Sequence, residues 1–462
     1  MSQNDVNPKV LRLPDLTLFT VSAIVLLDTL AASASIGASS LTWWLLLGVL
    51  FMLPIGLITA ELGTSYPAEG GIYVWIKKAF GQEWSTRAMW AYWINTAIWL
   101  PAIFILFAGV LARLFHIDMS IFQQVILGII LGWLSVAVDV FGLKIGKWVP
   151  NLGAVLKMVI FGVLIFGGFY YAGQNGYANE INAKTLSPNL EDGLKFLPAI
   201  IYGMLGFELV SSAGSEIQKP ERNVPRAIIL SGVLILAFYF FSSLGILAAI
   251  PAGEIDIVDG LIDTLDLFFA NVPGGDALVL LLGIGALYTS WSNGTTWAMG
   301  CNRSVAEAAS EGQLPSMFAK RHAEHGGPIG AAILMGCVCT VALVLYGALV
   351  DSNEDLFWAL FSFSAVIFML PYAGMVLAFL KLRFIDPDTV RPFRAPGGLW
   401  GAKLLAGICF IILVMTIGLF LYVPGEGLQK STLYGVVGVL IIGEGLIRWA
   451  RKTGINYDVR DQ

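Results

Sequence analysis

The stretch LLDTLAASASIGASS, residues 26–40, places one aspartate and a run of small residues inside a long apolar segment. The stretch IYGMLGFELVSSAGS, residues 201–215, shows the same pattern, with two glycines followed by a glutamate. Small residues alone permit close packing of helices, but a carboxylate in mid-membrane is costly and usually functional. We therefore expect two interrupted helices whose exposed backbone groups bind a substrate or an ion, as in transporters built from inverted repeats.

The composition places these stretches in a membrane. Of the 462 residues, 57% are hydrophobic and 13% are charged, and the mean hydropathy is +0.77. A soluble domain carries about a quarter charged residues, so the composition excludes a soluble enzyme, a disordered chain, a coiled coil and a disulfide scaffold. The net charge of −5, without a basic block, argues against a nucleic-acid partner. The sequence predicts a protein that crosses the lipid bilayer.

Neither a metal centre, nor a cofactor, nor an enzymatic activity is predicted. The cysteines are scattered in or beside apolar runs and are interpreted as free packing thiols, and the three histidines form no ligand pattern. The motifs H-E-x-x-H, G-x-S-x-G and the Walker loop are absent, and no channel filter is visible. The sequence leaves the oligomeric state open.

Twelve apolar runs are long enough to cross a bilayer, since a transmembrane helix needs about 20 mostly apolar residues. Because these runs do not alternate, they predict helices and not a barrel. The predicted spans are residues 17–37, 41–61, 88–112, 120–142, 149–173, 194–214, 227–250, 276–300, 328–350, 356–381, 403–423 and 432–449. Lysine and arginine gather in the loops that share a side with both termini, whereas the opposite loops are acidic, as at residues 254–266. This asymmetry predicts that both termini are cytoplasmic.

Three loops resemble those of the amino acid–polyamine–organocation (APC) superfamily of transporters. AELGTSYPAEGGIYVWIKKAFG, residues 60–81, resembles its P-x-x-GG-x-Y-x-W loop, and SEIQKPERNVPRAI, residues 215–228, resembles its E-x-x-x-P-x-R-x-x-P-R-A loop. GCNRSVAEAASEGQLP, residues 300–315, is similar to its G-x-x-R-x-x-x-A-x-x-G-x-L-P stretch. Within the superfamily the chain looks closest to bacterial glutamate/GABA-antiporter-like members and to polyamine uptake transporters.

The resemblance implies an all-α membrane protein with the leucine-transporter fold, in which five helices, five more of inverted topology and two accessory helices follow one another. Substrate would bind at the midplane between the broken first and sixth helices, and alternating access would open the site to one side at a time. The location implied is the bacterial inner membrane. The implied division is a tail at 1–16, a core at 17–381 with repeats at about 17–173 and 194–381, accessory helices at 403–449 and a tail at 450–462.

Lys157 lies within the fifth span, in the sequence NLGAVLKMVIF. A lysine near the centre of a span costs about 3 kcal/mol on insertion scales, unless it reaches the interface by snorkelling. In proton-coupled members of the superfamily, a lysine of the fifth helix takes the place of a sodium ion and contacts carbonyls of the broken first helix. The resemblance therefore implies a proton-coupling role for Lys157 and transport that does not depend on sodium.

Asp28 departs from the family pattern. The resemblance places Asp28 and Thr29 where amino-acid-transporting members show a G-S-G-like stretch, whose free backbone N–H groups receive a substrate carboxylate. A fixed carboxylate there would repel an acid and attract an ammonium, which favours an amine or polyamine substrate. Two alternatives are a pair with Lys157 and a carboxyl group that is protonated at rest.

Glu208 corresponds to an acidic residue that, in relatives, carries or senses protons beside the substrate. A low-dielectric environment favours the neutral form of a carboxyl group, so a midplane glutamate is a natural proton carrier. Its alternative role is to cap the amides of the broken helix. Further candidates for substrate contacts are Thr29, Tyr202, Gly203, Phe207, Asn293 and Trp297, and the aromatic ring of Trp297 suits an alkylammonium through cation–π attraction.

These residues favour a secondary transporter that moves an amine, a polyamine or a related amino acid, driven by protons or by exchange. The partners expected are the small substrate, protons and lipid. The alternative is an antiporter of zwitterionic or acidic amino acids, of the glutamate/GABA type, in which Asp28 acts as a protonation site. A third hypothesis is a transporter-like nutrient sensor, which would bind its ligand without flux.

Overall fold

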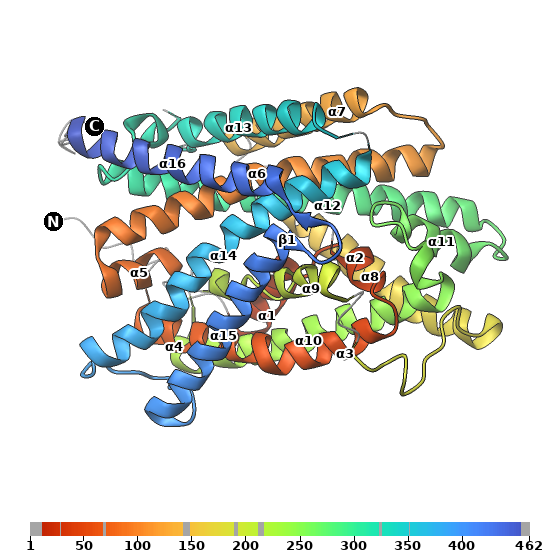
Figure 1. Cartoon of the computed structure of the whole chain (residues 1–462), viewed down its shortest axis with the longest axis horizontal. Coiled ribbons are helices and arrows are strands. Elements are labelled where there is room, and N and C mark those ends of the chain that lie inside the picture. The colour runs from red at the N-terminus through yellow and green to blue at the C-terminus, as the bar shows by residue number, and fades with distance from the viewer. Residues whose placement is uncertain are drawn as a thin grey trace.

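The computed structural model describes residues 12–27, 29–67, 71–141, 148–188, 193–210, 217–322, 326–350 and 352–453. Within these ranges the chain is a bundle of helices with one two-residue hairpin (Figure 1). The helices are α1 (Leu13–Ile24), α2 (Leu30–Ala34), α3 (Ser39–Leu47), α4 (Leu53–Ser65), α5 (Ile72–Phe80), α6 (Gln82–Phe115), α7 (Ile121–Phe141), α8 (Trp148–Asn175), α9 (Gly193–Tyr202), α10 (Pro220–Ala249), α11 (Gly260–Phe269), α12 (Gly275–Ser310), α13 (Ile329–Gly347), α14 (Asn353–Ile385), α15 (Gly398–Leu421) and α16 (Lys430–Thr453). A π-helical segment, η1 (Gly48–Met52), joins α3 to α4, short 3-10 turns lie at η3 (Ala252–Glu254) and η4 (Ser316–Ala319), and β1 (Tyr422–Val423) pairs antiparallel with β2 (Gly427–Leu428).

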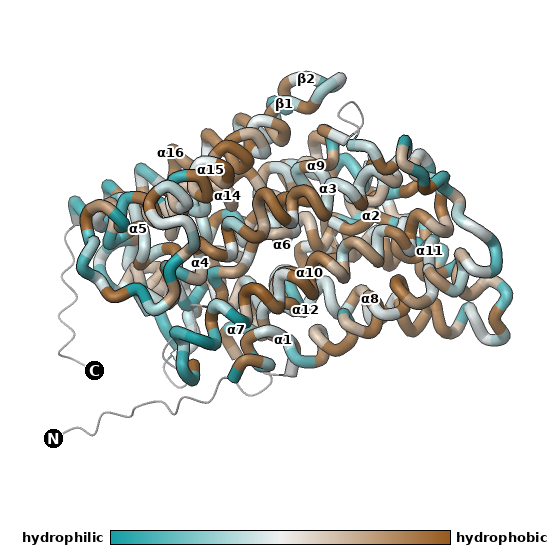
Figure 2. The backbone as a smooth tube through the Cα atoms, turned by 90° about the horizontal axis from the view of Figure 1, so that it is seen from below, coloured by the Kyte–Doolittle hydropathy of each residue, from teal (hydrophilic) through white to brown (hydrophobic). Residues whose placement is uncertain are grey.

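The expected all-α membrane architecture is confirmed. In the described part of the chain, eleven helical segments are long and apolar enough to span a bilayer. The remaining predicted span, the first, at residues 17–37, is covered by two short helices, α1 and α2, as expected of an interrupted helix. Figure 2 shows hydrophobic residues across the middle of the molecule and hydrophilic residues at both ends of its long axis. Large apolar side chains such as Phe122, Phe166 and Ile411 are exposed on the outside of the bundle, which is the surface that lipid covers.

The two ends of the molecule differ in the elements that they carry. The amphipathic helix α5 lies at one end and α11 at the other, and α16 finishes at the same end as α5 (Figures 1 and 2). Helix α6 packs against both α12 and α14. These two ends of the molecule are named the α5 end and the α11 end.

The first and sixth spans are both broken and meet at their breaks. Helix α1 ends at Ile24, and α2 begins only at Leu30. Helix α9 ends at Tyr202 and is followed by a 3-10 turn at 207–210. Gly206, between them, has a φ of +124°, a conformation that L side chains rarely adopt, and a Cβ there would lie 2.8 Å from Ile24. The glycine therefore allows both the turn in the sixth span and its close approach to the first.

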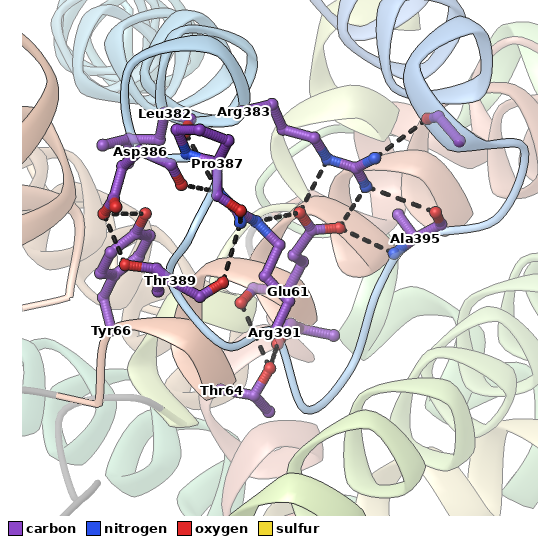
Figure 3. Close-up of polar contacts among 12 residues, drawn as sticks. Glu61, Thr64, Tyr66, Leu382, Arg383, Asp386, Pro387, Thr389, Arg391 and Ala395 are labelled. Atoms are coloured by element: carbon purple, nitrogen blue, oxygen red, sulfur yellow. Dashed lines mark hydrogen bonds and ion pairs between the residues drawn. The ribbon is translucent and has the colours of Figure 1, made fainter.

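Glu61, Arg383 and Arg391 form a buried ionic cluster, called here the Glu61 cluster (Figure 3). Arg383 holds both carboxylate oxygens of Glu61, one of them at 2.8 Å, and Arg391 lies 3.4 Å from the same carboxylate. The backbone N–H of Ala395 donates to Glu61 at 2.7 Å. This cluster fastens the last part of α4 to the end of α14 and to the loop that leads into α15. Opposite charges and backbone groups satisfy each other here, as a buried carboxylate requires.

Candidate functional site

A cavity of about 600 Å³ is lined in part by Ile72 and Tyr73, the first residues of α5, and so reaches the α5 end of the bundle. Exposed residues line its mouth, among them Asp15 of α1 and Arg303 of α12. Its inner part reaches Lys157 of α8 and Glu208 of the 207–210 turn, whose exposed fractions are only 3% and 4%. The cavity therefore connects the surface at one end of the molecule with two buried charged side chains beside the broken helices.

Lys157 is fixed against the first helix. Its Nζ donates to the backbone carbonyl of Ser22 at 2.7 Å and to Oδ1 of Asn293 at 3.2 Å. The contact with a carbonyl of the first helix, expected from the family resemblance, is present. A carbonyl in the last turn of a helix has no helical N–H partner. The ammonium group of Lys157 takes that place, as a bound metal cation could. The proton-coupling role of Lys157 stays a prediction.

Glu208 has neutral partners. Its Oε1 accepts a hydrogen bond of 2.8 Å from the hydroxyl of Tyr92 on α6, and the hydroxyl of Tyr372 on α14 lies close to the same carboxylate. Its Oε2 accepts no hydrogen bond, and no lysine, arginine or histidine in the described ranges forms an ion pair with it. Unlike Glu61, this buried carboxylate retains an unused acceptor.

Aromatic rings surround this part of the cavity. The ring of Trp297 lies 6.3 Å from that of Tyr92 and 5.9 Å from that of Phe368, between centroids. Tyr92 and Trp297 both line the cavity. Aromatic faces attract ammonium and guanidinium groups, so the carboxylate and these rings together form an environment suited to an organic cation.

A second set of rings packs beyond the cavity, towards the end where α9 begins. Tyr202 lies 4.8 Å from Phe361 and 5.4 Å from Phe368 between ring centroids. Trp358 extends this packing to Phe196 in the first turn of α9. Tyr202, Phe361 and Phe368 are buried, and Phe196 and Trp358 are half-buried. The rings therefore fill the space between the cavity and that end of the molecule.

The predicted substrate contacts separate into two groups. Asn293, Trp297 and Glu208 line the cavity. The remaining candidates are buried but do not line it, and they are Thr29, Tyr202, Gly203 and Phe207. The turn after α9 explains the difference, because it sends Glu208 into the cavity and turns its neighbour Phe207 towards Gly232 of α10. Asp28 lies outside the described residues. None of these placements tests substrate binding, which stays a prediction for each residue.

Sequence reasoning missed Tyr92, Tyr372 and Ser22 as parts of the site. Each lies in a helix whose own sequence is mostly apolar, so periodicity does not show which face meets the cavity. The chain has 14 tyrosines, and nothing in the sequence distinguishes these two. Within the described ranges, no group of three or more His, Cys, Asp or Glu residues is placed to hold a metal ion.

Known proteins match this chain over most of its length. The family model described as "Amino acid permease" matches residues 11–443. A probable agmatine/putrescine antiporter of Lactococcus lactis subsp. lactis is 34% identical over 441 residues, which cover 93% of each chain. A glutamate/gamma-aminobutyrate antiporter of the same organism is 23% identical over 421 residues, 87% of this chain and 82% of that protein. A probable polyamine transporter of Arabidopsis thaliana is 25% identical over 386 residues, 77% and 68% of the two chains.

These similarities agree with the apolar helices in identifying a multi-pass membrane protein with a transport role. The family model covers nearly the whole chain, including both broken spans and the cavity between them. The chain therefore belongs to the amino acid permease family, within the APC superfamily of transporters.

Proposed function

We propose that this protein is a sodium-independent exchanger of small organic amines that bear at least two positive charges, such as agmatine and putrescine. The observation that carries the proposal is Glu208, a buried carboxylate with a free acceptor oxygen at the inner end of an aromatic-lined cavity. Hydrogen bonds between an ammonium and a carboxylate are among the stronger ones in proteins. The similarity to a probable agmatine/putrescine antiporter supports the same substrate class.

The arrangement favours a cation over an acid for an electrostatic reason. A substrate carboxylate beside Glu208 would face a carboxylate that has no ion pair among the described residues, and repulsion between like charges is strong where the effective dielectric is low. An ammonium or guanidinium would instead find the carboxylate on one side and the rings of Tyr92 and Trp297 on the other. The predicted carboxylate of Asp28 in the first span adds a second negative charge for a divalent amine.

The cavity corresponds to one of the two states of alternating access. It is open at the α5 end and closed by aromatic packing at the other end. Because the distribution of lysine and arginine predicts that the α5 end faces the cytoplasm, we assign this structure to an inward-open state. Exchange then requires a second state in which the ring packing around Tyr202 opens and the α5 end closes.

Lys157 replaces a metal cation in this scheme. Its ammonium binds a first-helix carbonyl and an amide oxygen, so a sodium ion is not needed at the break. A change in the protonation of Lys157 would alter its hydrogen bond to the carbonyl of Ser22 in α1. Through this bond a proton gradient can act on transport.

The alternative function is exchange of glutamate for GABA, as in the antiporter that is 23% identical to this chain. In that case Glu208 would serve as a protonation site and the substrate carboxylate would bind free backbone N–H groups at the broken helices. The two functions differ in whether a carboxylate-free amine is carried.

An exchange assay in proteoliposomes tests the proposal. Vesicles loaded with unlabelled putrescine, agmatine, glutamate or GABA are given labelled putrescine outside, in sodium or in choline buffer. We expect uptake only with an amine inside, and equal rates in both buffers. Exchange of labelled GABA for internal glutamate, without putrescine flux, would contradict the proposal and support the alternative. Binding of putrescine without flux would identify a sensor.

The predicted role of Asp28 is tested in the same vesicles. If Asp28 holds one ammonium of the substrate, Asp28→Asn abolishes putrescine exchange. Near-normal affinity for putrescine in this variant would overturn the role of Asp28. It would not affect the role of Glu208, which the Glu208→Gln variant tests.

A further inference from the structure

The loop between α14 and α15 lies at the α5 end of the molecule and is tied to the Glu61 cluster (Figures 1 and 3). Arg383, which binds Glu61, also donates to the backbone carbonyl of Gly398, the first residue of α15, at 3.0 Å. Arg391 donates to the carbonyl of Asp386, where α14 ends, at 2.8 Å. Because these bonds hold both ends of the loop, the side chains that flank it keep a fixed arrangement.

The helix ends beside this loop present aromatic and aliphatic side chains on the outside of the bundle. Trp400, in the first turn of α15, is 81% exposed. Phe384, in the last turn of α14, is exposed as well, and so are Leu399 and Leu404 of α15. An exposed tryptophan at the end of a transmembrane helix is typical of the interface between lipid and water. This surface therefore lies at the level of the lipid headgroups.

Two lysines lie against the aromatic rings of this surface. Nζ of Lys403 is 5.0 Å from the ring centroid of Trp400 and 5.9 Å from that of Phe384. Nζ of Lys381 is 4.5 Å from the ring centroid of Phe80, the last residue of α5. Lys381 precedes Phe384 by three residues and therefore lies on the same face of α14. Both ammonium groups thus belong to one aromatic surface that α5, α14 and α15 share.

Neither of these lysines forms an ion pair with a carboxylate among the described residues. Lys77, at the same end of the molecule, pairs with Glu311, whereas Lys381 and Lys403 lie against rings instead. Residues 381–403 contain five basic and two acidic residues, so the excess charge of this segment is positive. An ammonium group over an aromatic face keeps N–H donors available for an anion.

We propose that this surface binds an anionic phospholipid, whose phosphate group contacts the ammonium groups of Lys381 and Lys403 while its chains pack against Trp400 and Phe384. The distribution of lysine and arginine predicts that the α5 end faces the cytoplasm, and anionic lipids of that leaflet attract basic groups close to the membrane. A soluble phosphate ester carries the same charge but has no chains, so a lipid is the ligand that uses both the lysines and the exposed rings. None of these four residues lines the substrate cavity, and the inference does not depend on which substrate is carried.

Lipid titrations of the purified full-length protein in a non-ionic detergent test the proposal, with binding followed by native mass spectrometry. The probes are dioctanoyl phosphatidylglycerol, which is anionic, dioctanoyl phosphatidylcholine, which has the same chains and no net charge, and glycerol 3-phosphate, which has no chains. A lysine close to the membrane surface is worth about fivefold in affinity for anionic lipid. We expect phosphatidylglycerol to bind at least about tenfold more tightly than phosphatidylcholine, and glycerol 3-phosphate to bind far more weakly than either lipid. Equal binding of the two lipids, or equally tight binding of glycerol 3-phosphate, would overturn the proposal.

Lys403→Gln removes one of the two ammonium groups, and Lys430→Gln is the matched control. Lys430 is also an exposed lysine, but it begins α16 at the opposite end of the molecule. We expect Lys403→Gln to lower the affinity for phosphatidylglycerol about fivefold and to leave that for phosphatidylcholine unchanged, whereas Lys430→Gln binds both lipids as the wild type does. Lys403→Arg keeps the charge and should restore the preference for the anionic lipid. No loss in Lys403→Gln, or an equal loss in Lys430→Gln, would overturn the role of Lys403.

Trp400→Ala tests the apolar half of the site. Removing the exposed ring takes away contact with the lipid chains but leaves both lysines, so the affinities for phosphatidylglycerol and phosphatidylcholine should fall by the same factor and their ratio should stay as in the wild type. Unchanged affinity for both lipids would contradict the role given to the ring. These measurements need no transport, so a failure of amine exchange in vesicles would overturn the proposed substrate and not the lipid site.

Discussion

The Glu61 cluster and the cavity around Glu208 both bury a carboxylate within the helical bundle, yet they partner it in opposite ways. Glu61 is enclosed by Arg383, Arg391 and a backbone N–H (Figure 3). Glu208 has one hydroxyl as a hydrogen-bond donor and keeps one oxygen without a partner. A carboxylate whose acceptors are all used can only hold the structure together, whereas one with a free acceptor can bind a cation or a proton.

The difference also separates stability from transport. Removing one member of a fully paired buried cluster leaves an uncompensated charge and is strongly destabilising. Neutralising a buried carboxylate that has no ionic partner removes an uncompensated charge instead. The loss of that charge is therefore expected to affect function while the fold remains. Variants of Arg383 and Glu208 test this separation, and variants of Lys157 and Asp259 extend the comparison to two other charged groups.

Arg383→Ala should cause the largest loss of stability. The side chains of Arg383 and Glu61 are only 2% and 3% exposed, and breaking a buried pair of this kind costs about 3–5 kcal/mol. The thermal midpoint of the purified protein in detergent measures the effect. The control is Arg87→Ala, which removes a partly exposed pair with Glu444 and should cost less than about 1 kcal/mol. Similar losses in the two variants would contradict the structural role given to the Glu61 cluster.

Glu208→Gln should weaken amine exchange strongly with little change in stability. The amide oxygen can still accept from Tyr92, but the charge that binds an ammonium is lost, and a charge-assisted hydrogen bond is worth about 1.5–3 kcal/mol. We expect the half-saturating putrescine concentration to rise at least about tenfold and the thermal midpoint to stay unchanged. Glu426→Gln, at an exposed pair with Lys195, serves as the control. Wild-type affinity in Glu208→Gln would remove the basis of the proposed function.

Lys157→Ala should uncouple transport from the proton gradient. The variant loses the contacts with the carbonyl of Ser22 and with Asn293, and with them the titratable group at the first break. We expect uptake that is no longer stimulated by an inward proton gradient, measured in vesicles at a fixed internal pH. Acid stimulation of the same size as in the wild type would count against the coupling role. Lys195→Ala, at the other end of the molecule, should keep it.

Asp259, at the α11 end, should make a smaller contribution to the pH dependence of stability, and its raised pKa fixes the direction. Burial and the neighbouring carboxylates of Asp256 and Asp263 raise the pKa of Asp259 to about 6. Between about pH 4 and 6 the folded state therefore binds more protons than the unfolded state, and stability falls as the pH rises through this window. Because Asp259 is partly exposed, the total change should be at most about 1 kcal/mol. In Asp259→Asn the thermal midpoint at pH 7 should be slightly higher and the fall between pH 4 and 6 smaller, and an unchanged pH profile would contradict the assignment.

The sequence predicts the helical scaffold well because the bilayer constrains it. Every span must satisfy its own backbone groups, so long apolar runs translate directly into helices, and the two runs with a carboxylate and small residues are the two that break. The contact between Lys157 and the first span was expected from family resemblance and is present. Thus the scaffold follows from local sequence, and the neighbourhood of Lys157 follows from the family resemblance.

The partners of each charge could not be predicted, because they depend on which helices meet. Arg383 and Glu61 are 322 residues apart, and Tyr92 and Glu208 are 116 apart. Nor does the sequence show that Phe207 and Glu208, which are adjacent, point to different surroundings, because this follows from the turn at 207–210 and not from a helical period. The distinction between a paired and a free carboxylate therefore required the three-dimensional structure.

A calorimetric titration of the purified protein with putrescine and, separately, with GABA tests whether Glu208 binds the substrate cation. The two compounds share a four-carbon chain and one ammonium group, and they differ in whether the other end is an ammonium or a carboxylate. If Glu208 binds a substrate cation, putrescine binds at least about tenfold more tightly than GABA, and Glu208→Gln removes this preference. Tighter binding of GABA, or a preference for putrescine that survives in Glu208→Gln, would contradict the account.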